Sequence, residues 1–60
     1  MQEYTVEYQL HWKEQNARTV EVMLDRKPDL NDNEQLADLY QIVSDAIREN
    51  ITSFEILAIR

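Results

Sequence analysis

An alternation of apolar and polar residues runs from Tyr4 to Trp12. Every second residue is apolar, and the polar residues between them are Thr5, Glu7, Gln9 and His11. A period of two over nine residues is typical of a strand with one buried face. We expect this strand to lie at the centre of the core, because its apolar face carries three of the five aromatic residues of the chain, in the set Tyr4, Val6, Tyr8, Leu10 and Trp12.

Two further segments are predicted to be strands. Residues 18–24 also alternate, with Val20, Val22 and Leu24 on one side and Thr19, Glu21 and Met23 on the other. The polar link 13–17 predicts an antiparallel hairpin, and because the chain has no glycine we expect a loop of four or five residues rather than a two-residue turn. The segment 51–60 predicts a third strand, with one apolar face formed by Phe54, Ile56 and Ala58 and a second apolar stretch formed by Leu57 and Ile59.

Residues 32–50 predict an amphipathic helix. Its start is indicated by two pairs that can each form a capping box, Asn31 with Glu34 or Asp32 with Gln35. Asn50 is the expected left-handed residue at its end. The spacing of three and four places one apolar face toward the core, formed by Leu36, Leu39, Tyr40, Val43, Ala46 and Ile47.

The order of these elements is strand, strand, helix, strand. The charged segment 25–29 contains the single proline, which cannot donate to a strand ladder, and therefore ends the second strand. A helix between strands two and three forms a crossover that leaves those two strands parallel. We therefore expect one α+β domain over residues 1–60: a three-stranded antiparallel sheet with ββαβ connectivity, favoured order 2-1-3, and the helix on one face.

Length and composition restrict how such a chain is stabilised and what it can bind. A 60-residue chain without cysteine and with one histidine cannot form disulfides or a zinc site of several cysteines or histidines. We therefore expect packing or self-association to stabilise its fold. The net charge is −6, and residues 29–49 hold six acids against one arginine, which is the reverse of a nucleic-acid-binding surface. The N-terminus does not resemble a signal peptide, and no apolar run is long enough to span a bilayer. We expect a soluble, cytoplasmic protein with no direct binding of nucleic acid or membrane.

Catalytic chemistry is not expected. His11 is the single imidazole and is predicted to lie on an exposed strand face, so a serine–histidine–acid arrangement has little support. Without glycine there is no phosphate-binding loop, and the oxygen-rich segment 29–34 lacks the glycine and the spacing of a calcium loop. We therefore expect no enzymatic activity, no cofactor and no metal site.

Two surfaces are candidates for partner binding. The first is an acidic row on the outer helix face, which can also be a simple solvated surface: Glu34, Asp38, Asp45 and Glu49. The second comprises strand three and the sheet face away from the helix, where exposed apolar residues can support self-association: Met23, Leu57 and Ile59.

These surfaces lead to two hypotheses. The first is a non-enzymatic protein-interaction module, homodimeric, that binds or modulates a partner protein. The alternative is an acidic mimic of nucleic acid that inhibits a DNA-binding protein. The composition is also compatible with a phage or prophage accessory protein, while the partner itself is not encoded in any recognisable motif.

Overall fold

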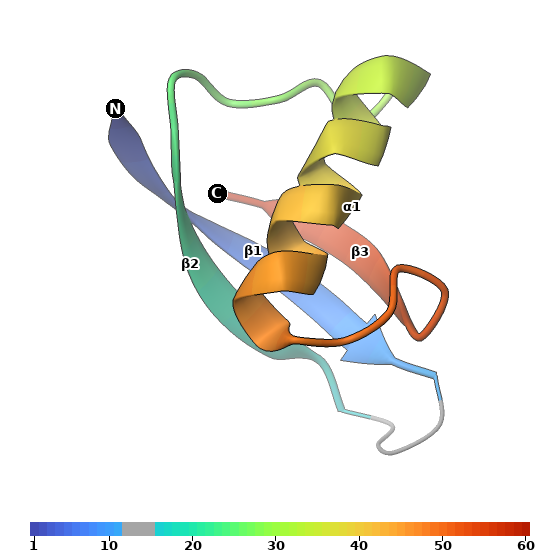
Figure 1. Cartoon of the computed structure of the whole chain (residues 1–60). Coiled ribbons are helices and arrows are strands. Elements are labelled where there is room, and N and C mark those ends of the chain that lie inside the picture. The colour runs from blue at the N-terminus through green and yellow to red at the C-terminus, as the bar shows by residue number, and fades with distance from the viewer. Residues whose placement is uncertain (12–15) are drawn as a thin grey trace.

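The computed structural model describes residues 1–11 and 16–60 and confirms the predicted architecture (Figure 1). The elements follow the order β1 (Gln2–Leu10), β2 (Arg18–Leu24), α1 (Asn33–Ile47) and β3 (Phe54–Ile59). The strands form one sheet of order β2-β1-β3, and β1 pairs antiparallel with both neighbours. The predicted core position of Trp12 and most of the predicted hairpin loop lie outside the described residues.

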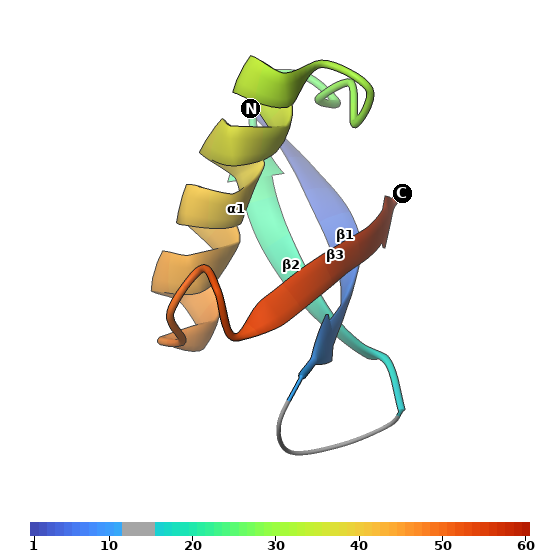
Figure 2. The same cartoon turned by 90° about the vertical axis from the view of Figure 1, so that its right-hand side faces the viewer.

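The helix crosses one face of the sheet and leaves the other face uncovered (Figure 2). The predicted apolar side of β1 faces the helix, since Val6, Tyr8 and Leu10 are all buried. The core is closed by residues from β2, α1 and β3, and its largest fully buried side chains are Phe54, Leu39, Val6 and Val43. Phe54 lies at the centre of an aromatic group, because Tyr40 stacks on its ring at 5.3 Å and Tyr8 meets it edge-on at 6.1 Å.

A β-bulge in β3 changes which side chains reach the core. Glu7 pairs with Ala58 but Tyr8 pairs with Ile56, so Leu57 is the extra residue of β3. The extra residue shifts the alternation, and the next residues change face. The prediction that Ile59 shares the uncovered face with Leu57 is therefore wrong: Ile59 is 6% exposed and pairs with Val6, whereas Leu57 is 42% exposed. Ala58 occupies the position opposite Glu7 instead.

The helix is shorter than the predicted range 32–50 at both ends. Asp32 is the N-cap, and its carboxylate accepts hydrogen bonds from the Glu34 and Gln35 backbone N–H groups. Gln35 Nε2 also donates to the second Asp32 oxygen (3.1 Å), so of the two predicted capping pairs the Asp32–Gln35 pair forms.

The predicted left-handed end residue is wrong, because Arg48 and not Asn50 takes that conformation (φ 59°). The Ser44 carbonyl accepts the Glu49 N–H (3.2 Å), and the Ser44 hydroxyl donates to the Glu49 carbonyl, so the last turn closes two residues early. Asn50 instead forms the turn into β3, where its Oδ1 accepts the N–H and hydroxyl of Thr52 (3.0 Å each).

Candidate partner-binding surfaces

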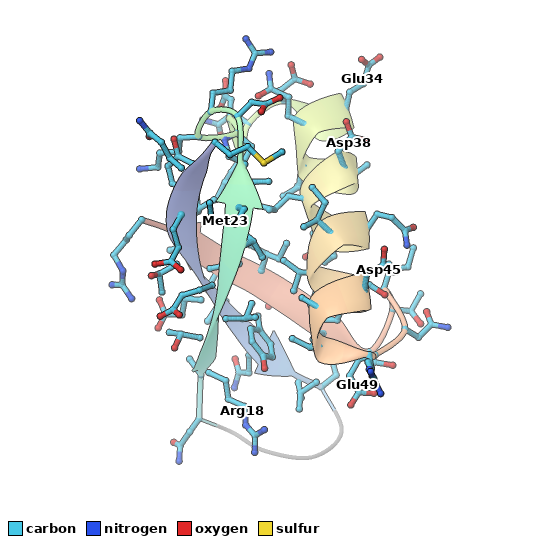
Figure 3. All side chains as sticks on the ribbon, turned by 60° about the vertical axis from the view of Figure 1, so that its left-hand side comes forward. Arg18, Met23, Glu34, Asp38, Asp45 and Glu49 are labelled. Carbon is cyan, nitrogen blue, oxygen red and sulfur yellow. The ribbon has the colours of Figure 1, made fainter. Side chains whose placement is uncertain are left out.

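An acidic row follows the outer side of α1 to the segment just past the helix end. Figure 3 shows the carboxylates of Glu34, Asp38 and Asp45 along the helix and that of Glu49 at its lower end. The first three are exposed and Glu49 is half-buried. At about 1.5 Å of rise per residue, the eleven steps from Glu34 to Asp45 span roughly 16 Å along α1, and Glu49 follows the left-handed Arg48 past the helix end. The structure thus places Glu34, Asp38 and Asp45 on one exposed side of α1, whereas Glu49, predicted for the same helix face, lies beyond the end of the helix.

The acidic row has little internal charge compensation. Among the described residues, no lysine or arginine forms an ion pair with any of its four carboxylates, although Asp45 Oδ1 accepts a 3.4 Å hydrogen bond from Gln41 Nε2. A fifth carboxylate, Asp32, extends the negative surface at the start of the helix. The Gln35 side-chain amide, followed by the backbone N–H groups of Glu34 and Gln35, lowers the pKa of Asp32 below its ordinary value. Asp32 therefore stays ionised throughout the neutral range.

The uncovered sheet face is polar rather than apolar. Its residues include four glutamates, which lie on all three strands: Glu3, Glu7, Glu21 and Glu55. Met23 (54% exposed) and Leu57 (42% exposed) lie on β2 and β3, at opposite edges of the sheet and separated by β1. With Ile59 in the core, the three residues predicted for self-association do not form one surface.

The two edges of the sheet differ in how their backbone groups are used. The outward-pointing Ile56 N–H of β3 donates to the Tyr40 hydroxyl (3.0 Å), so the helix covers part of that edge. In the central strand, Thr5 exchanges both backbone bonds with Arg60, which follows β3 (2.9 and 2.8 Å), and this leaves the neighbouring residues of β1 to bond β2, the other edge. The same alternation directs the backbone groups of Thr19, Glu21 and Met23 away from the sheet. β2 is therefore the edge better suited to pairing with another strand.

A small groove lies between the connection that follows β2 and the first half of α1. Its volume is about 180 Å³, and its apolar walls are Leu24, Pro28, Leu39 and Ile42. This groove is not predictable from the sequence, because its walls come from segments whose approach depends on the path of residues 25–32. One signal was present: Ile42 borders the apolar helix stripe and remains 38% exposed beside the acidic row.

The residues that could carry chemistry are dispersed. His11 is exposed, and its backbone N–H donates to the Ser53 carbonyl (2.9 Å). The Asp29 and Asp32 carboxylates accept backbone N–H groups in the turn before α1, at Asn31, Glu34 and Gln35. Within residues 1–11 and 16–60, no three histidine or carboxylate side chains are grouped closely enough to hold a metal ion.

Two further findings concern membrane-spanning helices and similarity to known proteins. In the part of the chain that the structure describes, no helix has both the length and the apolar character needed to cross a bilayer. Comparison with models of known families, with curated proteins and with solved structures finds no match to this chain.

Proposed function

We propose that this domain is a non-enzymatic protein-interaction module that binds a basic surface of a partner protein through the acidic row of α1. One observation supports the proposal above the others: three carboxylates, at Glu34, Asp38 and Asp45, lie along one exposed side of α1 and have no basic ion-pair partner among the described residues (Figure 3). The opposite side of that helix is anchored by Leu39 and Val43, which are 1% and 0% exposed. The row is therefore presented on a firmly packed element.

The spacing of the carboxylates lets them act on a partner together. Glu34 and Asp38 are one turn apart, at about 6 Å along the helix axis. This separation is shorter than the screening length of about 8 Å at physiological ionic strength. Their fields therefore add, which raises the rate of encounter with a positively charged protein and orients it.

Mimicry of nucleic acid is the competing function, and the spacing favours it less. Phosphates of one DNA strand follow each other at about 3.4 Å along the helix axis. Within α1 the acidic row has steps of four and seven residues, which correspond to roughly 6 and 10 Å, and Glu49 follows past the helix end. A basic protein patch with a few lysines or arginines fits this irregular spacing better than a groove built for regular phosphates.

Self-association is also part of the proposal, at an edge of the sheet rather than across its open face. Two copies stacked through the open face would bring their glutamates together, and like charges at short range oppose association. Pairing of β2 with β2 of a second copy avoids this stacking and uses backbone groups that β1 leaves unbonded. Sedimentation of the full chain tests it: a dimer that is retained in 1 M salt and lost on Glu21→Pro, which removes an outward-pointing N–H of β2, supports edge pairing if the variant preserves its helical circular dichroism.

The interaction proposal is tested by capture from lysate at low and high salt. The triple variant Glu34→Gln, Asp38→Asn, Asp45→Asn removes three charges from the row. Its matched control Glu3→Gln, Glu21→Gln, Glu55→Gln removes three charges from the open sheet face. We expect one protein to be captured by the parent and control chains and lost both with the helix variant and in high salt. Equal capture by both variants refutes the role of the row, and capture of DNA-binding proteins alone favours the competing function.

A further inference from the structure

The groove beside the acidic row has a distinctive combination of walls and rim. Leu24 and Pro28, both half-buried, face Leu39 and Ile42 of α1 across a volume of about 180 Å³. In Figure 1 the connection from β2 passes above the sheet to reach the start of α1. Asp25, Arg26 and Pro28 of this connection line the groove. Ligand pockets for small molecules begin at about 300 Å³, so this groove fits one long side chain rather than a cofactor.

The polar groups at the rim determine which side chain suits the groove. Gln35 also lines it, but the Gln35 amide already donates to Asp32 and accepts the Asp29 N–H (2.9 Å). The carboxylates of Asp25 and Asp38 have no hydrogen-bond or ion-pair partner among the described residues. Arg26, also at the rim, is exposed and partly offsets their charge. Two acidic groups above apolar walls therefore remain available to a ligand.

We propose that this groove binds a single lysine or arginine side chain of a partner protein. The aliphatic part of such a side chain lies along Leu24, Pro28 and Ile42, while its charged end reaches Asp25 and Asp38. A purely apolar side chain would remove water from the two carboxylates without replacing its hydrogen bonds, and an acidic one would be repelled by them. The inference rests on the proposed function and identifies the basic side chain that anchors the partner next to the row.

Asp38 belongs to both the groove and the row, whereas Asp45 belongs to the row alone. Asp38→Asn and Asp45→Asn therefore make a matched pair, with the same chemistry, the same charge change and the same exposed helix. If the row acts only as a diffuse field, the two variants weaken binding equally. If the groove holds the basic side chain, Asp38→Asn has the larger effect.

The test is a titration of the full-length, ¹⁵N-labelled chain, followed by amide chemical shifts. The probes are blocked pentapeptides with a central lysine, arginine or norleucine between glycines, at up to tens of millimolar. We expect the lysine or arginine peptide to shift the amides of Leu24, Asp25, Leu39 and Ile42, and norleucine to bind more weakly. Loss of one exposed ion pair predicts a roughly two- to five-fold weakening for Asp38→Asn and a smaller effect for Asp45→Asn.

Three outcomes overturn the groove proposal: no shift with either basic peptide, equal binding of norleucine, or equal weakening by the two variants. The outcome is separable from that of the proposed function. Capture of a partner that depends on the row, combined with equal effects of Asp38→Asn and Asp45→Asn, retains the interaction module and rejects the groove. Peptide binding in the groove without any captured partner retains the groove proposal and rejects the interaction module.

Discussion

Tyr40 makes two separable contacts with β3, and Tyr40→Phe removes just one of them. The ring stacks on Phe54 with centroids 5.3 Å apart, and the hydroxyl accepts the Ile56 N–H at 3.0 Å. Phenylalanine keeps the ring and its packing but leaves the Ile56 N–H without this acceptor. The substitution therefore measures how much the covered edge of β3 contributes to the free energy of unfolding.

The expected cost is that of one partly buried hydrogen bond. A net loss of about 0.5–1.5 kcal/mol is typical, and it rises toward about 3 kcal/mol when water cannot replace the lost partner. The contact is part-buried rather than enclosed. We therefore expect about 1 kcal/mol, which corresponds to a fall in Tm of about 4–8 °C for a domain of this length.

The assay is urea and thermal unfolding followed by far-ultraviolet circular dichroism, with Tyr4→Phe as the control. The Tyr4 hydroxyl donates to Gln2 Oε1 (3.0 Å) at an exposed position, so its loss should change the free energy of unfolding by less than about 0.5 kcal/mol. Equal values for the two variants would refute the reasoning, because the edge N–H would then be satisfied equally well by water.

Three further predictions follow from burial, the bulge and the helix cap. Leu39→Ala should lower the free energy of unfolding by about 2–5 kcal/mol, whereas Ile42→Ala, at an exposed position, should lower it by about 1 kcal/mol. Similar values for the two variants would contradict the described orientation of the helix. Ile59→Lys should lower the free energy of unfolding by at least about 3 kcal/mol, whereas Leu57→Lys should change it by no more than about 1 kcal/mol; the opposite order in urea unfolding would reject the bulge. Because the pKa of Asp32 is lowered in the folded state, its carboxylate stabilises the fold above its unfolded pKa and loses that effect as pH falls below about 4. Asp32→Asn keeps a capping side chain and should reduce this acid sensitivity, which unfolding at pH 7 and pH 3 measures; an unchanged dependence on pH would contradict this role.

The elements and their order could be predicted because they depend on local periodicity and on general rules of connection. The alternation in β1 and β2 and the helical spacing in α1 each identify one buried face. The crossover rule then places β1 in the middle, as observed. The residue that ends the helix was harder to predict, since one turn lies at Arg48 and another follows Asn50. The choice of Arg48 depends on hydrogen bonds between Ser44 and Glu49 that no composition rule describes.

The candidate binding surfaces likewise include one that the sequence predicts and one that it does not. Helical spacing alone places Glu34, Asp38 and Asp45 on one face, and the structure agrees, whereas the position of Glu49 depends on where the helix ends. The groove depends on where residues 25–32 pass relative to α1, and that path is fixed by long-range packing. Pro28 and Leu30 are both half-buried in this segment, although the sequence reads as a charged connection. The path of a short loop that buries apolar side chains cannot be predicted from its sequence pattern alone.

The bulge at Leu57 connects the fold to the choice of binding surface. The run from Phe54 to Ile59 is apolar on both strand faces beyond Glu55, so its pattern fits two registers equally well. The bulge resolves this ambiguity by placing Phe54, Ile56 and Ile59 on the core side, and burial of the additional isoleucine contributes about 1.5–3 kcal/mol. The same shift replaces Ile59 on the open face by the smaller Ala58 and leaves that face dominated by glutamates. A surface of that kind repels a second copy of itself. The acidic row of α1, with the groove beside it, is therefore the better candidate for binding a partner.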